Sequence, residues 1–426
     1  MNLLERYWNL SRKTTAVAAA LGVASVVIGC AAWLLKWLIA LALDVMHRSI
    51  ASGWIANVVL IAVAVLTILF VGWFVRRIVK MPLEHATEQL QQRLVDKKGF
   101  MPLRLTVSSI FATALTLGGG GSAGAEGPIA YTGAAIGSNI ARFFKLSPQA
   151  MLVFMACGGG AGIAAIFKSP IGGMFFTIEV LRMQLGVKAV IMLGFMCLIS
   201  SLTALALTDF TPDLAVSVGL TFEWSMIVPA IVLGLVCGLY AAYYSRISAY
   251  TRNRIENIRR PVVRNAVSGL ILGLLLAAFP ALYGEGYGVL GELAAGKLGA
   301  ATDNSIVGWI HGPWLPAVGL GCLLLVKSIA CTVSNSGGGV AGTFTPTLFA
   351  GAILGTLFTY LWPGSLPPDI AIVCGMAGAM SGIIRAPLMS VFLVIEMTRC
   401  NSLLMPVCVV VILSFIVSSL LQRRYI

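Results

Sequence analysis

Two stretches of the sequence match one another and decide the fold. Residues 157–179 read CGGGAGIAAIFKSPIGGMFFTIE, and residues 374–396 read CGMAGAMSGIIRAPLMSVFLVIE. Cys, Gly, Ile, Pro, Phe and the final Ile-Glu recur at identical spacing, and a basic residue, Lys168 or Arg385, stands two positions before each proline. The offset from Cys157 to Cys374 is 217 residues, about half of the 426-residue chain.

A second pair of matching stretches lies just upstream of the first. Residues 124–137 read GAEGPIAYTGAAIG and residues 342–355 read GTFTPTLFAGAILG, so that three glycines, a proline and an alanine recur at an offset of 218. Shared small-residue membrane composition is the alternative explanation, but it does not predict two blocks in the same order at nearly one offset. We therefore expect two homologous halves, as in transporters whose binding site lies at Gly- and Pro-interrupted helices.

The composition predicts an all-α membrane protein that crosses the bilayer many times. Apolar residues make up 58% of the chain and charged residues 11%, less than half of the roughly 25% of a soluble domain. This excludes an ordinary cytosolic enzyme, a disordered chain and a disulfide-rich secreted module. We expect the membrane-spanning segments to be helices, because lipid offers no hydrogen-bond partners and each backbone N–H and C=O group must bond within the protein.

Apolar runs mark the expected spans. Seven are long enough to cross: 17–35, 54–75, 187–208, 225–243, 264–282, 314–330 and 403–421. Four more are short or interrupted by Gly and Pro: 128–144, 150–167, 346–362 and 369–393. Most of the nine cysteines fall within these runs, where they are interpreted as small hydrophobic residues.

The repeat divides the chain into five parts. We expect a cytoplasmic N-terminal segment, a first membrane repeat, an external linker, a second membrane repeat and a C-terminal pore-lining helix: 1–15, 16–208, 209–224, 225–398 and 399–426. Between 209 and 223 the chain carries Asp209, Asp213 and Glu223 and no Lys or Arg. An acidic linker between two cytoplasmic termini predicts that the second repeat is an inverted copy of the first.

The charge distribution predicts the orientation. Basic residues outnumber acidic ones by 29 to 16, a formal net charge of +13. They gather at the N-terminus, in 76–104, in 246–264 and at Arg423–Arg424. The positive-inside rule places these regions in the cytoplasm, so we expect a multi-pass protein of the cell (inner) membrane. The same rule explains the excess charge, and nucleic acid is not expected as a partner.

Three acidic residues lie inside apolar or Gly-rich membrane stretches, where an ionised group is costly and marks a function or a partner. Glu126 stands in GGGGSAGAEGP (118–128), and Pro128 suits the first turn of a short helix. Glu126 is therefore expected at a helix N-terminus, which attracts anions. It is interpreted either as a capping carboxylate or as a group that occupies the place of an anion and is displaced or protonated. Glu179 and Glu396 are interpreted as structural, paired with helix-end cations or capping groups.

The matching segment of the second half, GGGVAGTFTP (337–346), also places a glycine-rich turn before a proline, with Phe344 at the position of Glu126. Two helix N-termini brought together by pseudo-symmetry would offer several N–H donors without a full positive charge. Such a site suits a permeating anion, because a Lys or Arg partner would hold the anion too long.

These motifs resemble the CLC chloride channel and antiporter family, in particular prokaryotic members without CBS domains. The resemblance lies in Gly-x-Glu-Gly-Pro at 124–128, Gly-x-Phe-x-Pro at 342–346 and Ile395-Glu-Met-Thr398, and it covers about residue 70 to the end. It implies a homodimer with an anion pathway in each subunit and Glu126 as the external gating and proton-coupling glutamate. The implied anion-binding residues are Gly124, Ala125, Glu126, Gly127, Thr343, Phe344 and Tyr425.

The departures from the family pattern are informative. The first family motif, Gly-Ser-Gly-Ile-Pro, is missing, and its best match, 78–82, places Val79 at the coordinating serine. Val79 has no hydroxyl, so the central site is expected to use backbone amides or Lys80, although Lys80 is also explained as one more cytoplasmic charge. Val180 follows Glu179 where proton-coupled members commonly have an internal glutamate. This weakens the prediction of an exchanger.

We expect the chain to carry a small monovalent anion such as chloride, as a gated channel or an anion/proton antiporter, with no cofactor and no metal. A fluoride-selective CLC-type transporter is one alternative, since the serine is missing. An intramembrane serine protease is a remote one, because Gly121-Ser-Ala-Gly124 resembles a Gly-x-Ser-Gly motif. That chemistry needs a base, and His47, His85 and His311 all fall near helix ends or loops.

Overall fold

The computed structural model describes residues 3–49, 54–81, 83, 85–96, 99–211, 214, 216, 223–302, 305–306 and 314–422. In these residues the chain forms the following α-helices: α1 Leu3–Ser49, α2 Trp54–Phe74, α3 Ala86–Val95, α4 Arg104–Gly118, α5 Glu126–Phe143, α6 Pro148–Phe167, α7 Pro170–Phe175, α8 Val187–Ala206, α9 Ile227–Glu256, α10 Pro261–Ala278, α11 Tyr287–Ala294, α12 Leu315–Ser336, α13 Phe344–Leu361, α14 Pro368–Ile384, α15 Pro387–Thr398 and α16 Leu404–Gln422. Short helical segments of other types join them: η1 Val75–Val79, η2 Phe176–Val180, η3 Trp224–Met226, η4 Pro280–Leu282, η5 Leu298–Ala301 and η7 Asn401–Leu403.

Nine helices of the described part are long and apolar enough to cross a membrane. The seven long apolar runs of the sequence fall in α1, α2, α8, α9, α10, α12 and α16, and the runs 150–167 and 346–362 add α6 and α13. The run 369–393 is divided between α14 and α15, because Arg385 takes a left-handed conformation and Pro387 starts a new helix. The predicted all-α membrane fold is confirmed.

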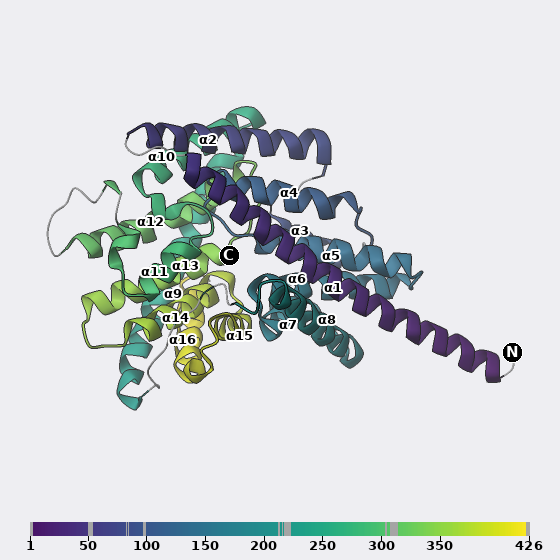
Figure 1. The fold of residues 1–426 in the computed structure, drawn as a ribbon. Helices are drawn as coiled ribbons and strands as arrows, with labels where there is room; N and C mark the ends of the chain where they lie inside the picture. The colour runs from purple at the N-terminus through teal and green to yellow at the C-terminus, as the bar shows by residue number, and fades with distance from the viewer. Residues whose placement is uncertain are drawn as a thin grey trace.

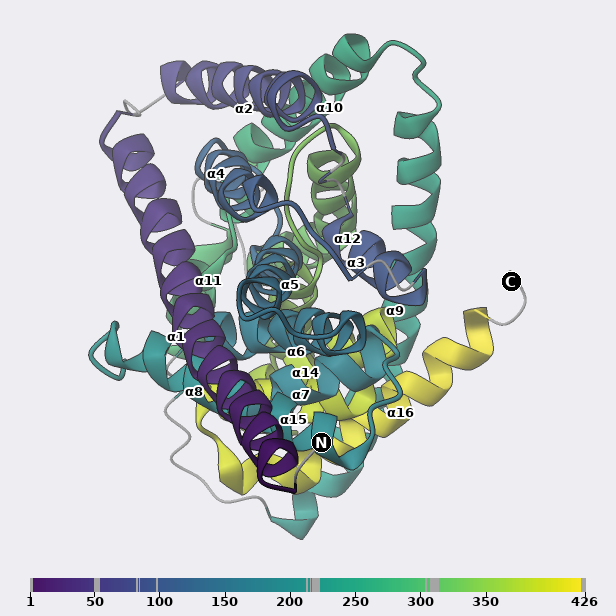
Figure 2. The same cartoon turned by 90° about the vertical axis from the view of Figure 1, so that its right-hand side faces the viewer.

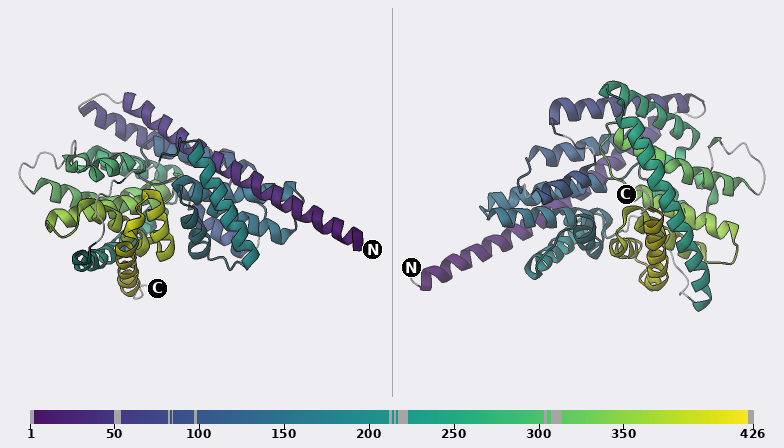
Figure 3. Two further views of the ribbon diagram at one scale, coloured as in Figure 1. Left: turned by 60° about the horizontal axis from the view of Figure 1, so that its bottom comes forward. Right: turned by 180° about the vertical axis from the view of Figure 1, so that it is seen from behind.

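The two halves of the chain lie side by side and interlock. In Figure 1, α5 to α8 lie to one side and α12 to α16 to the other, while α2 of the first half packs along α10 of the second. Figure 2 shows α5 in the interior between α4 and α6. The N-terminal end of α1 extends beyond the other helices in both views of Figure 3.

Small residues let equivalent helices of each half approach closely. The Gly133 and Gly158 backbones touch where α5 crosses α6, and a Cβ on either glycine would meet the other's carbonyl oxygen. Gly351 and Gly375 make the same contact between α13 and α14. Packing through small residues is how membrane helices come close when no hydrophobic force drives them together, so these pairs explain why the glycines recur at the repeat offset.

The contacts of α16 match those of α8. Helix α8 packs against α6 and α1, and α16 packs against α14 and α9. Helix α16 therefore takes the place in the second half that α8 takes in the first. The boundary at 398, predicted from the sequence, stays a prediction, and this match favours a second repeat that includes α16.

A pseudo-two-fold axis passes between two equivalent phenylalanines. The rings of Phe175 and Phe392 stack with centroids 5.1 Å apart and planes 12° apart. Beside them, the Glu179 carboxylate accepts hydrogen bonds from Leu388 N–H (3.2 Å) and Met389 N–H (2.8 Å), which begin α15. The axis thus relates η2, which carries Glu179, to α15.

The equivalent carboxylate makes the reciprocal contact. Glu396 accepts hydrogen bonds from Ile171 N–H (2.9 Å), Gly172 N–H (3.1 Å) and Ser169 Oγ (2.6 Å) at the start of α7. Each carboxylate therefore caps a helix of the opposite half. The predicted structural role of Glu179 and Glu396, as capping groups, is confirmed.

Four basic residues with left-handed backbones fall into two pairs, each with one residue from each half. Lys168, Arg182, Arg385 and Arg399 have φ angles of 54° to 62°. Lys168 and Arg399 both donate to backbone carbonyls of 210–211, at 2.6 and 2.7 Å, whereas Arg182 and Arg385 line one cavity. Lys168 is equivalent to Arg385 and Arg182 to Arg399, so each place is shared by two non-equivalent residues, one from each half, as a two-fold axis between the halves requires.

Candidate functional site

The two glycine-rich breaks lie against each other. Gly124 and Gly342, which are equivalent in the repeat, form an antiparallel bridge. The Gly124 N–H donates to the Gly342 carbonyl at 3.0 Å, and the Gly342 N–H donates back to the Gly124 carbonyl. The expected meeting of 118–128 and 337–346 is therefore confirmed, and the N-termini of α5 and α13 approach one another.

Each break is held by a hydroxyl group of the opposite half. The Ser122 N–H donates to Ser334 Oγ at 3.1 Å, and the Val340 N–H donates to Thr116 Oγ1 at 3.0 Å. Ser334 is equivalent to Thr116 and Val340 to Ser122, so one contact occurs twice. All four residues are buried. An unpaired N–H is costly there, so these bonds make irregular backbone tolerable inside the membrane.

Glu126 begins α5, but its carboxylate is bound by the opposite half. Oε1 accepts hydrogen bonds from the Phe344 N–H and from the Thr345 N–H (3.3 Å), and Oε2 accepts one from Thr345 Oγ1 at 3.0 Å. The residue is 1% exposed. The free N–H groups of a helix N-terminus carry about half a unit of positive charge. The Glu126 carboxylate therefore occupies the N-terminus of α13, and a helix N-terminus attracts anions in general.

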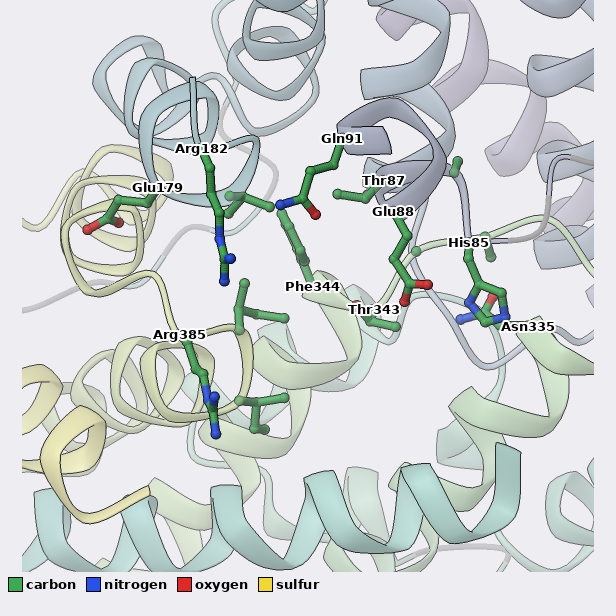
Figure 4. Close-up of a pocket in the computed structure, with 16 residues that line it drawn as sticks. His85, Thr87, Glu88, Gln91, Glu179, Arg182, Asn335, Thr343, Phe344 and Arg385 are labelled. Atoms are coloured by element: carbon green, nitrogen blue, oxygen red, sulfur yellow. The ribbon is translucent and has the colours of Figure 1, made fainter. Parts of the chain in front are cut away.

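A cavity of about 300 Å³ opens beside Phe344. Arg182 and Arg385 point into it from one side, and Thr87 and Glu88 of α3 line the other (Figure 4). The cavity therefore brings a pair of guanidinium groups next to the start of α13. Two carboxylates, Glu88 and Glu179, also line the cavity, so its lining carries both signs of charge.

The structure brings some of the candidate residues to this cavity. Thr343, Phe344 and Val180 line it, and Ala125 is fully buried at the start of α5. Tyr425 falls in 423–426, outside the described residues, so its role as an anion ligand stays a prediction.

Val79 and Lys80 lie elsewhere. Val79 ends η1, is 2% exposed and lines a separate cavity with Phe74, Ile78 and Arg104. Lys80 follows in a left-handed conformation and is exposed. The described residues of this segment that line the cavity beside Phe344 begin with His85 and Ala86, at the start of α3. Val79 and Lys80 are not among the residues that line the cavity beside Phe344. The lining therefore does not support the prediction that they bind the anion.

Thr87 is a hydroxyl-bearing residue that lines the cavity and lies near the start of α5. It lies in the first turn of α3 and lines the cavity. A Cβ on Gly127 would lie 3.3 Å from Thr87 Oγ1. Sequence reasoning missed Thr87 because it sought the hydroxyl next to Pro82, whereas the helix begins at Ala86.

An ion pair ties α3 to α9. Arg252 Nη1 and Nη2 donate to the two Glu88 carboxylate oxygens at 3.1 and 3.2 Å, and Arg252 Nε donates to Glu256 at 2.9 Å. Burial alone would raise the pKa of Glu88, but the hydrogen bond from Arg252 and the charges of His85 and Arg252 outweigh it and lower this pKa. The pair therefore helps to hold the helix that carries Thr87.

Lys327 is a buried basic residue beside the first glycine-rich break, and sequence reasoning did not include it in the site. It is fully buried on α12. Its Nζ donates to Ser122 Oγ at 2.9 Å and lies 4.5 Å from the Phe349 ring centroid. It is the one charged residue in the apolar run 314–330. A lone charge in an apolar run marks a function or a partner, and this is the signal in the sequence that points to Lys327.

Glu285 is a second carboxylate near the start of α5 that sequence reasoning missed. Its Oε1 accepts a hydrogen bond from the Ala125 N–H at 3.3 Å, and its Oε2 pairs with Lys36 Nζ at 3.2 Å. It is 7% exposed. It stands in a short Gly-Glu-Gly loop rather than in an apolar run, so no hydrophobic pattern indicates its burial.

A family model described as voltage gated chloride channel matches residues 67–419. The chain belongs to this family. A putative chloride channel protein ClcB-like of Ralstonia nicotianae is 28% identical over 345 residues, which cover 77% of this chain and 75% of that protein. The H(+)/Cl(-) exchange transporter ClcA of Klebsiella pneumoniae is 28% identical over 69% of this chain and 61% of its own length. The family therefore includes relatives named as channels and relatives named as exchangers.

Solved structures of the family share this fold. A slow cyanobacterial Cl⁻/H⁺ antiporter superposes with a TM-score of 0.78 at 20% identity, covering 95% of this chain and 97% of the other. A CLC-type fluoride/proton antiporter superposes with a TM-score of 0.75 at 19% identity, covering 95% of both chains. At these identities the likeness establishes the architecture, and substrate choice has to be argued from the site.

Proposed function

We propose that this chain carries chloride or a similar small monovalent anion across the membrane through the junction of α5 and α13, with Glu126 as the gate. The observation that carries the proposal is the Glu126 carboxylate on the N–H groups of Phe344 and Thr345. Those N–H groups are the donors that a dehydrated anion would use. The carboxylate and the anion therefore compete for the same place.

Protonation of Glu126 opens the gate. An ionised carboxylate makes charge-assisted hydrogen bonds to the N-terminus of α13, and these are roughly twice as strong as neutral ones. A protonated Glu126 keeps no negative charge for the helix N-terminus to attract. It then yields the donors to the anion, so anion flux rises as the pH falls.

The groups that hold the anion come from both halves. The Gly124 N–H is held by the Gly342 carbonyl, so the proposed backbone donors are N–H groups of 125–127 and 343–345. The Thr87 hydroxyl supplies one more from α3. Lys327 offsets part of the cost of removing an anion from water, which is several kcal/mol. Its bond to Ser122 places that charge beside the first break without a direct ion pair to the carried anion.

Proton coupling is weak or absent in this proposal. Val180 lines the cavity at the position where, by the family resemblance, a proton-coupled member carries an internal glutamate. A valine side chain neither accepts nor releases a proton. Position 180 therefore supplies no relay for protons that reach Glu126 from the cavity side, which favours a gated anion pathway over a tightly coupled exchanger.

An intramembrane protease is disfavoured by the surroundings of Ser122. Its Oγ accepts a hydrogen bond from Lys327, so this pair is a Ser–Lys contact of the kind that some hydrolases use. Both residues are fully buried, and neither lines the cavity beside Phe344. A substrate peptide would find no access to Ser122 from there, and we propose no enzymatic activity.

The proposed orientation places both termini in the cytoplasm of a cell whose inner membrane the chain spans, as a homodimer. The cavity beside Phe344 then opens to the cytoplasm, since Arg252 of the same network lies within the basic segment 246–264. Reporter fusions after 211 and 422 should report opposite sides. Light scattering of the purified chain should give twice the monomer mass.

Anion flux from proteoliposomes tests the function. Purified protein is reconstituted, and the release of chloride, fluoride and nitrate is followed with ion-selective electrodes. The proposal predicts chloride and nitrate release well above protein-free liposomes. Fluoride release without chloride release would establish the fluoride alternative. Release of none of the three anions would overturn the proposal.

A further inference from the structure

Glu285 lies on a tight loop that aims its carboxylate into the protein. The loop separates η4 from α11, and both flanking glycines are left-handed, with φ angles of 67° at Gly284 and 86° at Gly286. A Cβ on Gly286 would run into the ring of Phe349 on α13. The loop is therefore fixed against α13, and Glu285 has little freedom to turn toward solvent.

Two fixed groups from distant elements hold the two carboxylate oxygens of Glu285. The Ala125 N–H, directly before α5, donates to Oε1 at 3.3 Å, and Lys36 Nζ on α1 lies 3.2 Å from Oε2. Lys36 Nζ also lies 4.2 Å from the ring centroid of Tyr287, the first residue of α11. Lys36 is thus anchored at a defined place, and it would keep Glu285 nearby after the bond to Ala125 breaks.

The junction therefore has one carboxylate on the N-terminus of each broken helix. Glu126 binds the start of α13, and Glu285 binds the residue before α5. Under the proposed function, on which this inference rests, the N–H groups at both helix starts serve the carried anion. A carboxylate that occupies such a donor competes with the anion for it.

We propose that Glu285 is a second competing carboxylate, which holds the Ala125 N–H when no anion is bound there and releases it to an arriving anion while keeping its ion pair with Lys36. Glu285 thus lowers the affinity of the junction for anions and prevents the anion from being held too long. This role belongs to the α5 side of the junction and is separate from the gate at α13.

Isosteric and paired substitutions separate competition from a structural role. Glu285→Gln keeps the size and an acceptor oxygen but removes the charge. We expect chloride to bind about three- to tenfold more tightly, because the competing hydrogen bond from the Ala125 N–H is then no longer charge-assisted. Lys36→Met should weaken chloride binding, because it leaves the Glu285 charge uncompensated. The double variant Lys36→Met/Glu285→Gln removes both charges and should still bind more tightly than the wild type.

Isothermal titration of the purified full-length chain with chloride, together with chloride efflux from proteoliposomes, measures these effects. Glu285→Asp is the conservative variant and should restore wild-type affinity. Should Glu285→Gln fail to fold, the double variant gives the same comparison. If the double variant binds chloride with wild-type affinity, the tighter binding of Glu285→Gln comes from the uncompensated charge of Lys36. That result would overturn the proposal that Glu285 competes with the anion. Unchanged affinity in Glu285→Gln, in a wild type that carries chloride, would overturn this inference alone. A wild type that binds and carries no anion overturns the proposed function and the inference with it.

Discussion

Thr345 Oγ1 donates a hydrogen bond to Glu126 Oε2 at 3.0 Å, so the hydroxyl of one half holds the carboxylate of the other. The same residue also supplies its N–H to Oε1. Thr345 is therefore the residue of α13 that binds both oxygens of the proposed gate. The strength with which it binds them sets how readily an anion replaces Glu126.

Thr345→Val should loosen the gate. The substitution keeps the shape and removes one hydrogen bond to a charged group, which is worth about 1.5–3 kcal/mol. We expect chloride efflux at neutral pH to rise by about tenfold or more in proteoliposomes. Thr356→Val is the matched control, since its hydroxyl bonds to Ala352 within the same helix. Equal rates in the wild type and Thr345→Val would show that this bond does not limit opening.

Lys327→Met should weaken anion binding and spare the fold. Methionine fills a similar volume without a charge, and replacing a buried ion by an apolar residue is often neutral or stabilising. We expect the chloride dissociation constant to rise by about tenfold, equivalent to about 1.4 kcal/mol. Ser122→Ala keeps the charge and should have a smaller effect. An unchanged dissociation constant in Lys327→Met would exclude a role for this charge.

The ion pair of Glu88 with Arg252 should stabilise α3 in a pH-dependent way. The pKa of Glu88 is lowered in the folded protein, so its contribution is present above the unfolded pKa and is lost as the pH falls through the folded pKa. Glu88 is largely exposed, with 62% of its side chain accessible, so solvent screening limits the contribution to about 0.5 kcal/mol. Glu88→Gln should lower the melting temperature slightly at pH 7 and leave it unchanged in strong acid. A difference that grows on acidification would contradict this.

Val180 should keep proton coupling weak. In liposomes with an outward chloride gradient, we expect the wild type to move chloride with little accompanying proton movement, measured with a pH electrode. Val180→Glu introduces a proton-accepting group at the cavity and should increase the ratio of protons to chloride. Stoichiometric proton pumping by the wild type would contradict the role given to Val180.

The architecture was predictable because it is encoded in spacing. The pairs Gly124/Gly342 and Phe175/Phe392 are recognisable as repeats in the sequence, and both turn out to be contacts across one axis. A pseudo-two-fold axis makes equivalent residues near it neighbours. The repeat offset therefore predicted the meeting of the two breaks, whereas the inversion was predicted from the acidic linker between two basic termini.

The surroundings of the site were less predictable. The contact between Glu285 and Ala125 spans 160 residues and follows no periodicity. Lys327 was recognisable as a lone charge in an apolar run, but its bond to Ser122 depends on how α12 packs. The prediction for Val79 depended on where the helix after Pro82 begins. Because the Gly-Ser-Gly-Ile-Pro motif is missing, the sequence does not mark the start of this helix, which is Ala86.

The central claim is that Glu126 competes with the anion for the donors of α13. Chloride efflux from proteoliposomes, measured between pH 4 and 8 for the wild type, Glu126→Gln and Glu126→Ala, tests it most directly. We predict that wild-type efflux rises as the pH falls and that both variants carry chloride at a rate that does not change with pH. A full wild-type pH response in the two variants would contradict the claim.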